Sequence, residues 1–396
     1  MSKNKNISVR LLRLTIVVLL FALVTYLIPH YWCAREAPQI FSNSGNIQEK
    51  IAKQVESIIS HEMDRKSFKT GSELFNGEWL FGSYMMSGMG FGQMAILNPG
   101  QKERYLTQME KCIRQMLSPD VREFDKNSWE NDPIDSLDSD SDHAAYLGYF
   151  NLLLSFHRLL KNKSEFSGLN DRITSALARR LEKSRTLLLQ TYPGEYYPVD
   201  NCAVIASIGL YDRATGANHS DLTGKCLSRM KNKYTDKKTG ILFQCVDGET
   251  GIPADLPRGS GTSLGLYFLS FIDPDLSLSL YNSLKRELRS GLFGFGGIKE
   301  YPSSVKGGYG DIDSGPVIFG YGFSASGFTV AGTRIHGDYD LFRKLYATVY
   351  LFGAPYDSNG KRNFVIGGPI GNSIMFAMLT ALDKNQFKKY CRSNGK

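Results

Sequence analysis

Six apolar segments recur along the chain at nearly even intervals, and this repeat constrains the fold more than any other feature of the sequence. Each segment begins with a polar or glycine-rich string and continues as a run in which Gly, Ala and Ser are mixed with large apolar residues. Their starts are 54 to 61 residues apart, which is typical of one repeated supersecondary unit. The starts lie near Gly82, His143, Asp200, Ser260, Ser314 and Asn372.

Amphipathic segments alternate with the apolar ones. In these segments apolar residues recur every three or four positions, and Lys, Arg and Glu occupy the opposite face. A helix that is apolar all round is buried, whereas a helix with one charged face lies at the surface. Two concentric rings of six helices satisfy both requirements. The sequence therefore predicts an all-α fold, an (α/α)6 barrel, over residues 46–396.

In such a barrel all inner helices run in the same direction, so their N-termini gather at one end. Polar residues that precede different inner helices then converge in space, although they lie far apart in the sequence. The free N–H groups and the positive end of each helix dipole favour anionic groups at this rim. The sequence therefore predicts a functional site at the N-terminal rim of the inner ring.

The N-terminus has the pattern of a membrane anchor. Residues 14–29 carry no charge, and four basic residues precede them. We expect a basic cytoplasmic tail at 1–13, a single-pass transmembrane signal anchor at 14–32 and a linker at 33–45. The positive-inside rule then puts the barrel outside the cytoplasm, which means the periplasm if the cell is Gram-negative. A cleaved signal peptide is the alternative, but "PHYWCAR" lacks the small residues of a cleavage site.

Several classes of function lose support from the sequence. The net charge of +8 includes no dense block of Lys and Arg, so we expect no nucleic-acid partner. The six cysteines form neither a CxxC pair nor a Cys/His metal spacing, and we predict no metal. Phosphate-loop, dinucleotide-binding, G-x-S-x-G and H-E-x-x-H motifs are also absent from the sequence. We expect a small-molecule substrate and no cofactor, and the oligomeric state stays open.

Residues 125–345 resemble the bacterial linalool dehydratase/isomerase family. The ordered pieces are "SWENDPID", "YLGYFNLLLSFHRLL", "TYPGEYYPVDNCAVIASIGLYDRATG", "GILFQCVDGETG", "TSLGLYFLSFIDPDLS" and "GFTVAGTRIHGDYDLF". The resemblance implies an (α/α)6 barrel with a pocket at the inner-helix N-termini and cofactor-free acid/base chemistry on a terpene alcohol. The family's catalytic histidine corresponds to Tyr149, and its two cysteines correspond to Thr191 and Asp200, with Cys202 offset.

Candidate catalytic and substrate-binding residues come from the strings that precede or open the inner helices. Asp200 is also a natural N-cap, and a cap at an inner helix would face the same rim. Carboxyl, imidazole and phenol groups there suit proton transfer. The predicted catalytic residues are Asp200, Asp313, Tyr149, Glu195 and His143. The predicted substrate-binding residues are Tyr146, Asn201, Tyr197, Asp247, Arg258, Glu300, Tyr301, Asp311 and Ser314.

Three functions fit these residues. The first is a lyase or isomerase of the linalool dehydratase/isomerase-like type, which protonates a hydroxyl of a small alcohol or terpenoid and removes a proton elsewhere. The second is a carbohydrate-active enzyme, either a glycoside hydrolase or a sugar epimerase, that uses paired carboxylates. The third is a ligand-binding barrel without catalysis.

Overall fold

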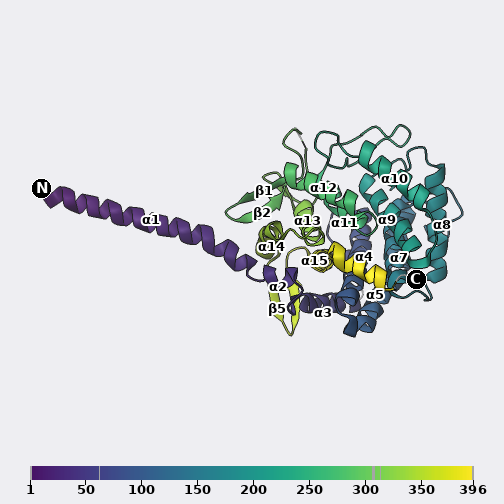
Figure 1. The fold of residues 1–396 in the computed structure, drawn as a ribbon, viewed down its shortest axis with the longest axis horizontal. Coiled ribbons are helices and arrows are strands. Elements are labelled where there is room, and N and C mark those ends of the chain that lie inside the picture. Colours follow the sequence, from purple (N-terminus) through teal and green to yellow (C-terminus); the bar gives the residue numbers. More distant parts are fainter. Residues whose placement is uncertain (1, 62, 306–307, 313, 395–396) are drawn as a thin grey trace.

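The computed structural model describes residues 2–61, 63–305, 308–312 and 314–394. Its centre is a closed ring of six helices, each in contact with the next and the last with the first (Figure 1). This ring confirms the predicted all-α barrel. The inner helices are α4 (Glu73–Leu97), α7 (Tyr149–Leu160), α9 (Pro198–Thr215), α11 (Gly259–Leu269), α13 (Phe323–Ile335) and α15 (Gly368–Leu379).

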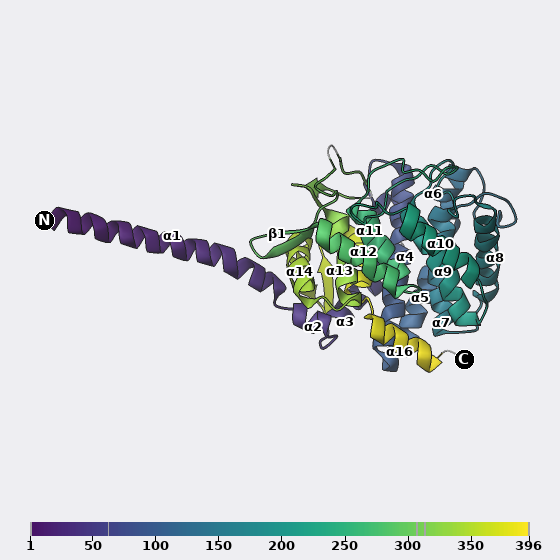
Figure 2. The same cartoon turned by 45° about the horizontal axis from the view of Figure 1, so that its top comes forward.

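An outer ring covers the inner one, and its helices are the predicted amphipathic segments. Each outer helix packs against at least one inner helix through its apolar face. The outer helices are α3 (Ile47–Ser60), α5 (Lys102–Met116), α8 (Ser167–Lys183), α10 (Ser220–Lys233), α12 (Pro274–Glu287) and α14 (Tyr339–Gly353). Besides α1 and α2 at the N-terminus, two more helices lie outside the rings in the described chain: α6 (Pro119–Trp129) lies between the first two repeats, and α16 (Lys384–Asn394) ends the described chain (Figure 2).

Three short antiparallel hairpins lie in the connections to the last inner helices. They are β1 (Arg289–Leu292) with β2 (Phe295–Ile298), β3 (Val317–Ile318) with β4 (Tyr321–Gly322), and β5 (Pro355–Ser358) with β6 (Lys361–Phe364). The segments "GLFGFGGIKEYP" and "RNFVIGGP", whose glycines and β-branched or aromatic residues suit short strands, contribute to the first and the last of these hairpins. The segment "TGILFQCVDGETG" forms only isolated bridges, such as Phe243 with Pro257.

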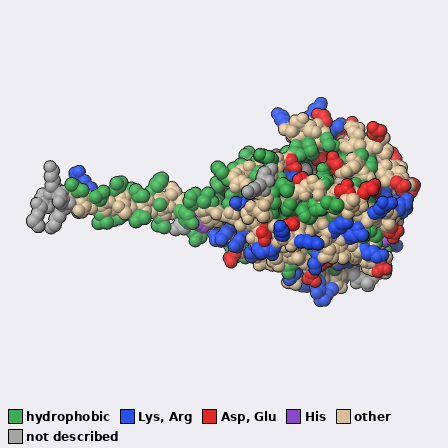
Figure 3. Space-filling model, turned by 90° about the horizontal axis from the view of Figure 1, so that it is seen from above, with side chains coloured by type: hydrophobic (Ala, Val, Ile, Leu, Met, Phe, Trp, Pro, Cys, Tyr) green, Lys and Arg blue, Asp and Glu red, His purple; other side chains and the backbone are tan. Residues whose placement is uncertain are grey.

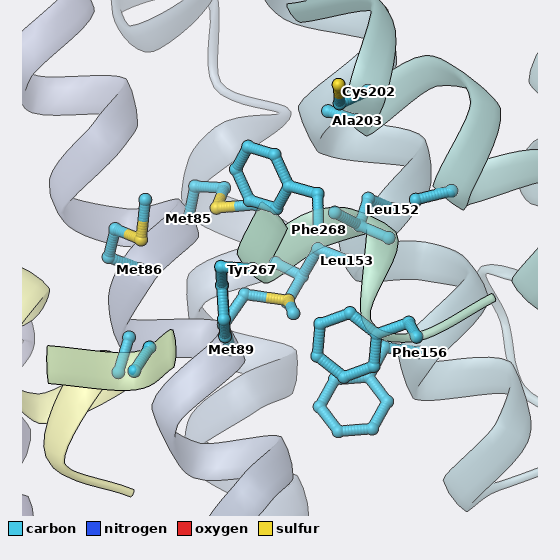
Figure 4. Packing of buried hydrophobic residues seen from close by; sticks show 14 of the residues in the cluster. Met85, Met86, Met89, Leu152, Leu153, Phe156, Cys202, Ala203, Tyr267 and Phe268 are labelled. Atoms are coloured by element: carbon cyan, nitrogen blue, oxygen red, sulfur yellow. The ribbon is translucent and has the colours of Figure 1, made fainter. Parts of the chain in front are cut away.

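Side chains fill the barrel axis, so the inner ring is a packed core (Figure 4). Met85 and Met89 of α4 lie in this core with Leu153 of α7 and Phe268 of α11. Glycines let the helices approach closely. A Cβ atom at Gly90 would lie 2.4 Å from the ring of Phe376 in α15. The mixture of small and large apolar residues in the sequence is thus a packing requirement.

The N-terminal helix α1 (Ser2–Ala34) projects from the body (Figures 1 and 2). By length and composition it is the one helix in the described chain that could cross a membrane. The expected linker at 33–45 is itself folded, because it contains helix α2 (Ala37–Phe41). Cys33 and Ala34 are buried against Ala347 of α14, so the end of α1 packs against the barrel.

We predict that Gly90→Ala destabilises the protein. The added methyl group would collide with Phe376, and overpacking of this kind costs about 1–3 kcal/mol. This cost is expected to exceed the gain in helix propensity, which is at most about 1 kcal/mol. Gly168→Ala in α8 is the matched control, because no atom lies within 4 Å of the added group. Chemical unfolding should show a loss for Gly90→Ala alone; equal stability of the two variants would contradict the packing argument.

Candidate functional site: two carboxyl clusters at the barrel rim

Asp200 lies in the first turn of α9 and is buried. The prediction that it caps the helix is wrong: α9 begins two residues earlier with Pro198, and Tyr197 is the N-cap. Proline suits the first helical position because its missing N–H is not needed there. The carboxyl group is thereby free to accept two other hydrogen bonds. The hydroxyl of Tyr149 donates to Oδ1 (2.6 Å), and the hydroxyl of Thr191 donates to Oδ2 (2.7 Å).

Burial raises the pKa of Asp200 above its usual value, and the hydrogen bonds from Tyr149 and Thr191 offset only part of this increase. A carboxyl group with a raised pKa keeps its proton to higher pH and can serve as a general acid. The floor beneath it is apolar, because the ring of Tyr149 packs edge-on against Phe268, with centroids 5.2 Å apart. The site therefore combines a proton donor with an apolar wall.

Two further residues belong to this group and were missed by the sequence analysis. The hydroxyl of Tyr192 donates to the carboxylate of Glu78, which lies in α4. The pKa of Tyr192 is raised well above its usual value, first by burial and then by the charge of Glu78. The charge of Asp200 acts on Tyr192 in the same direction, so the phenol lies within electrostatic reach of both acids. We call Glu78, Tyr149, Thr191, Tyr192 and Asp200 the Asp200 cluster.

A sequence signal for Glu78 existed. It lies four residues before Gly82, which we took as the start of the first inner segment. The structure begins α4 at Glu73, so Glu78 falls on the rim-side turns of an inner helix. Tyr192 carries no such signal, because it lies in an irregular loop and its partner is 114 residues away.

His143 has no exposed surface and pairs with Asp125 of α6, with its Nδ1 atom 2.5 Å from Oδ2. Its Nε2 atom lies 2.7 Å from Oδ1 of Asn131, and the ring of Trp129 packs beside it. Burial raises the pKa of Asp125, and His143 offsets part of that increase. Because both side chains are fully enclosed, they support the rim and do not line it.

The backbone at His143 is unusual. Its φ of 53° lies in the left-handed region, and a π-helical turn at Ala144–Gly148 follows. This turn leads directly into α7, whose first residue is Tyr149. The buried pair of His143 and Asp125 therefore holds the segment that positions the Tyr149 hydroxyl on Asp200.

A second group, the Arg258 cluster, surrounds the start of α11 and contains Arg258, Ser260, Glu300, Asp311 and Ser314. Arg258 is the N-cap of α11 and is buried. Its guanidinium group donates to both oxygens of Asp311 (2.5 and 2.8 Å) and to Oε1 of Glu300 (3.1 Å). Although burial alone would lower the pKa of Arg258, these carboxylates raise it.

Glu300 is the buried acid of the Arg258 cluster. Its Oε1 atom also accepts from the hydroxyl of Ser260 (2.5 Å), and burial raises its pKa despite the cation beside it. Ser314 donates its backbone N–H to Asp311. The two clusters are neighbours, since a Cβ atom at Gly261 in α11 would lie 3.7 Å from Val199 in α9.

The remaining predicted residues lie outside these clusters. Tyr146 and Asn201 are fully buried, and both bond to backbone: Tyr146 donates to the carbonyl of Met116, and Asn201 exchanges hydrogen bonds with Leu189. These backbone hydrogen bonds hold both side chains, and their contact with a substrate stays a prediction. Asp247 caps a turn through the N–H and hydroxyl of Thr250.

The other candidates lie near the mouth of the barrel. The hydroxyl of Tyr197 donates to Glu195, which is exposed, and the hydroxyl of Tyr301 donates to the carbonyl of Tyr309. Cys202 points into the core, where burial raises the pKa of its thiol. Asp313 lies outside the described residues. In the part of the chain that the structure describes, no three His, Cys, Asp or Glu residues are grouped as a metal site requires.

A pocket of about 320 Å³ opens at the opposite end of the barrel, between Arg334 and the start of α16. Arg334 is buried there, and burial lowers its pKa to about 10. Its guanidinium group is committed to the carbonyls of Ile40 and Ala381 and to the side chain of Asn43. This arginine joins the ends of helices, and the carboxyl groups with raised pKa lie at the other rim.

No protein-family model matches the chain, and no curated protein matches it. Two solved structures are similar in shape. A family 105 glycoside hydrolase from C. acetobutylicum is 11% identical, with a TM-score of 0.49 over 77% of this chain and 93% of that one. A family 76 α-mannanase from Bacteroides thetaiotaomicron is 9% identical, with a TM-score of 0.48 over 77% of this chain and 86% of that one. Identity this low carries no information on shared chemistry, so the activity has to be argued from the site.

Asp200 is expected to make the protein less stable as the pH rises, because its pKa is higher in the folded than in the unfolded chain. Its contribution is complete below the pKa of an unfolded Asp and is lost as the pH rises through the folded value. Asp200→Asn removes this dependence. Urea unfolding should therefore show that the stability of the variant, relative to that of the unchanged protein, is higher at about pH 8 than at about pH 4. Asp221→Asn, on the exposed start of α10, should show no such shift.

Arg258→Met is expected to lower the free energy of unfolding by about 3–5 kcal/mol, because Glu300 would remain buried without its cation. Asp311→Asn should cost about 1 kcal/mol or less, since 47% of the Asp311 side chain is exposed. The double variant Arg258→Met/Glu300→Gln should recover part of the loss. Equal effects of the two single variants, with no recovery, would contradict this account.

Proposed function

We propose that this protein is an acid/base enzyme in which Asp200 protonates the oxygen of a carbon–oxygen bond in a small hydroxylated substrate. The observation that carries the proposal is the environment of that carboxyl group. It is buried at the inner-helix rim, its pKa is raised, and two hydroxyl groups orient it. A carboxyl group that keeps its proton to higher pH than usual matches the requirement of a general acid.

The partners of Asp200 supply the rest of the chemistry. Tyr149 and Thr191 hold one carboxyl orientation and stabilise the carboxylate that remains after proton transfer, because both donate to it. The pair of Glu78 and Tyr192 provides a second carboxylate for removing a proton from the substrate. The acid and the base then come from α9 and α4, which is how a barrel rim combines groups from distant repeats.

A lyase or isomerase acting on a terpenoid-like alcohol is the first candidate. Phe268 packs edge-on against Tyr149 and belongs to the same apolar core as Met85 and Met86, and these apolar surroundings support an apolar substrate (Figure 4). Loss of water from such an alcohol needs one group to protonate the hydroxyl and one to take a proton from carbon, and no cofactor. The resemblance to the linalool dehydratase/isomerase family supports the same reaction. This chain differs from the family in its reactive groups, because a carboxyl and a hydroxyl group occupy the positions of the family's two thiols.

A carbohydrate-active enzyme is the second candidate, and a different observation favours it. The neighbouring Arg258 cluster contains another buried carboxyl group with a raised pKa, that of Glu300, which lies in the connection between β2 and α13 and accepts from Ser260 at the start of α11. Exposed or half-exposed aromatic rings, such as Tyr197 and Tyr309, lie at the mouth, where sugar rings stack on aromatic faces. Protonation of a glycosidic oxygen by Asp200 would be the first step there too.

We also propose that α1 anchors the enzyme as a single-pass membrane helix with its N-terminus in the cytoplasm. Its charge-free stretch and the basic residues before it support this orientation. The barrel then works outside the cytoplasm.

The test uses the full chain in lipid nanodiscs with two substrate panels, tertiary allylic terpene alcohols and aryl glycosides. Asp200→Asn should lower kcat/KM by about 10²–10⁴-fold on the panel that is turned over. Tyr149→Phe should lower it less and shift the acidic limb of the pH profile. Asp221→Asn on the exposed side of α10 should leave it unchanged. Turnover that survives Asp200→Asn would refute the assignment of the acid, and the panel that reacts decides between the two candidates.

A further inference from the structure

The β1–β2 hairpin lies against the membrane helix, although the two are far apart in the sequence. The ring of Phe293, at the hairpin tip, packs edge-on against Tyr26 of α1 with centroids 5.5 Å apart. The ring of Phe295 lies 6.3 Å from His30, and a Cβ atom at Gly294 would touch the same histidine. The hairpin therefore runs alongside the last turns of the apolar stretch of α1.

The junction between α1 and the barrel holds this arrangement in place. The guanidinium group of Arg35 lies between the rings of Trp32 (4.2 Å) and Tyr350 of α14 (4.7 Å), and it donates to the Tyr350 hydroxyl. Glu36 pairs with the buried Arg362 and accepts from the hydroxyl of Tyr346. These contacts hold the end of α1 against the barrel. Because the hairpin also packs on the barrel, the position of its tip relative to α1 is determined.

The depth of the tip follows from helix geometry. Tyr26 belongs to the charge-free stretch at 14–29 and precedes Trp32 by six residues. At about 1.5 Å per residue, it lies roughly 9 Å farther into the bilayer than Trp32 does. Trp and Tyr favour the interface, so a ring in contact with Tyr26 lies at the boundary of the hydrocarbon. When α1 spans a membrane, the tip of the hairpin therefore enters that membrane as well.

The residues of the tip suit this position, because their large apolar side chains are unfavourable in contact with water. Leu292 and Phe293 are 62% and 55% exposed. Phe293 also has a φ of 52°, in a two-residue turn with Gly294. Asn or Asp normally occupies that position, and a bulky aromatic residue is an outlier in the left-handed region. An exposed phenylalanine in a strained turn is explained if the ring has an apolar medium to enter.

The surface around the tip continues the same pattern. Hydrophobic side chains cover α1 and extend onto the adjoining part of the body (Figure 3). Tyr31 and Trp32, which are nearer to the barrel than Tyr26, are exposed, and the guanidinium group of Arg343 lies over the Tyr31 ring. Aromatic and basic residues at one level are what the headgroup region of a bilayer binds.

We propose that the β1–β2 hairpin is a second membrane contact, whose tip residues Leu292 and Phe293 enter the bilayer interface beside α1. The inference rests on the proposed role of α1 as an anchor. Two contacts at fixed separation hold the barrel at one orientation to the membrane, whereas one helix alone would let it rotate. The rim that carries Asp200 is then presented in a constant direction.

The experiment is lipid photo-crosslinking of the full chain in phosphatidylcholine/phosphatidylglycerol liposomes. A photoreactive p-benzoylphenylalanine replaces one residue at a time: Phe293, Leu20 in α1, or Ile252. Ile252 is the matched control, because it is 61% exposed but lies in the loop between α10 and α11. The substitute resembles phenylalanine and sits on exposed positions, so the fold should tolerate it.

Lipid adducts at Leu20 and Phe293, at least about tenfold above those at Ile252, are the expected result. Adducts at Leu20 with only the Ile252 level at Phe293 would overturn the hairpin contact and leave the anchor intact. An absence of adducts at Leu20 would overturn the anchor and, with it, this inference.

Discussion

The burial of six apolar helices against one another is the constraint on which the rest of this structure depends. Each inner helix must be apolar on all sides, and small residues such as Gly88 and Gly90 must let the helices approach within contact of Leu153 and Phe376. A ring of this kind closes only when every inner helix runs in the same direction. The outer helices, the loops and the position of the candidate site all follow from that common direction.

The same burial produces the chemistry of the rim. A carboxyl group at the top of a packed core loses water on the side that faces the core, and desolvation raises its pKa. Asp200, Glu300 and Asp125 all show this effect, but their surroundings differ. Glu300 has a cation and Asp125 has a histidine, whereas Asp200 has only hydroxyl donors. Asp200 is therefore the carboxyl group of the three that has no basic side chain as its hydrogen-bond partner, and for this reason we propose it as the acid.

The positions of α1 and of the β1–β2 hairpin depend on the barrel in turn. Helix α14 is an outer helix, yet it also holds the end of α1 and the β1–β2 hairpin. The junction is packed and is not a loose linker, so α1 and the hairpin both contact the barrel directly. The direction of α1 relative to the barrel is thereby linked to the direction of the rim, which is built from residues in the middle of the chain.

Much of the fold could be predicted from the sequence because its signals are local. The apolar and amphipathic runs predicted both rings, and the charge-free stretch predicted the helix that projects from the body. The site was less accessible. Asp200 and Tyr149 were found because they open inner segments, but Glu78 and Tyr192 were not, since their pairing joins residues 114 positions apart. For Tyr146 and Asn201, residue type and position did not reveal that their polar groups bond to the backbone of Met116 and Leu189.

The sequence by itself determined the number of repeats, the layering of the helices and the end of the barrel where polar residues converge, because hydrophobic periodicity acts along each segment. Only the tertiary structure decided which polar groups meet. It placed the helix start at Pro198 and turned Asp200 from an expected cap into a buried acid held by Tyr149 and Thr191. It also enclosed His143 with Asp125. The physical reason is that hydrogen bonds and desolvation depend on distances between segments, which no local pattern records.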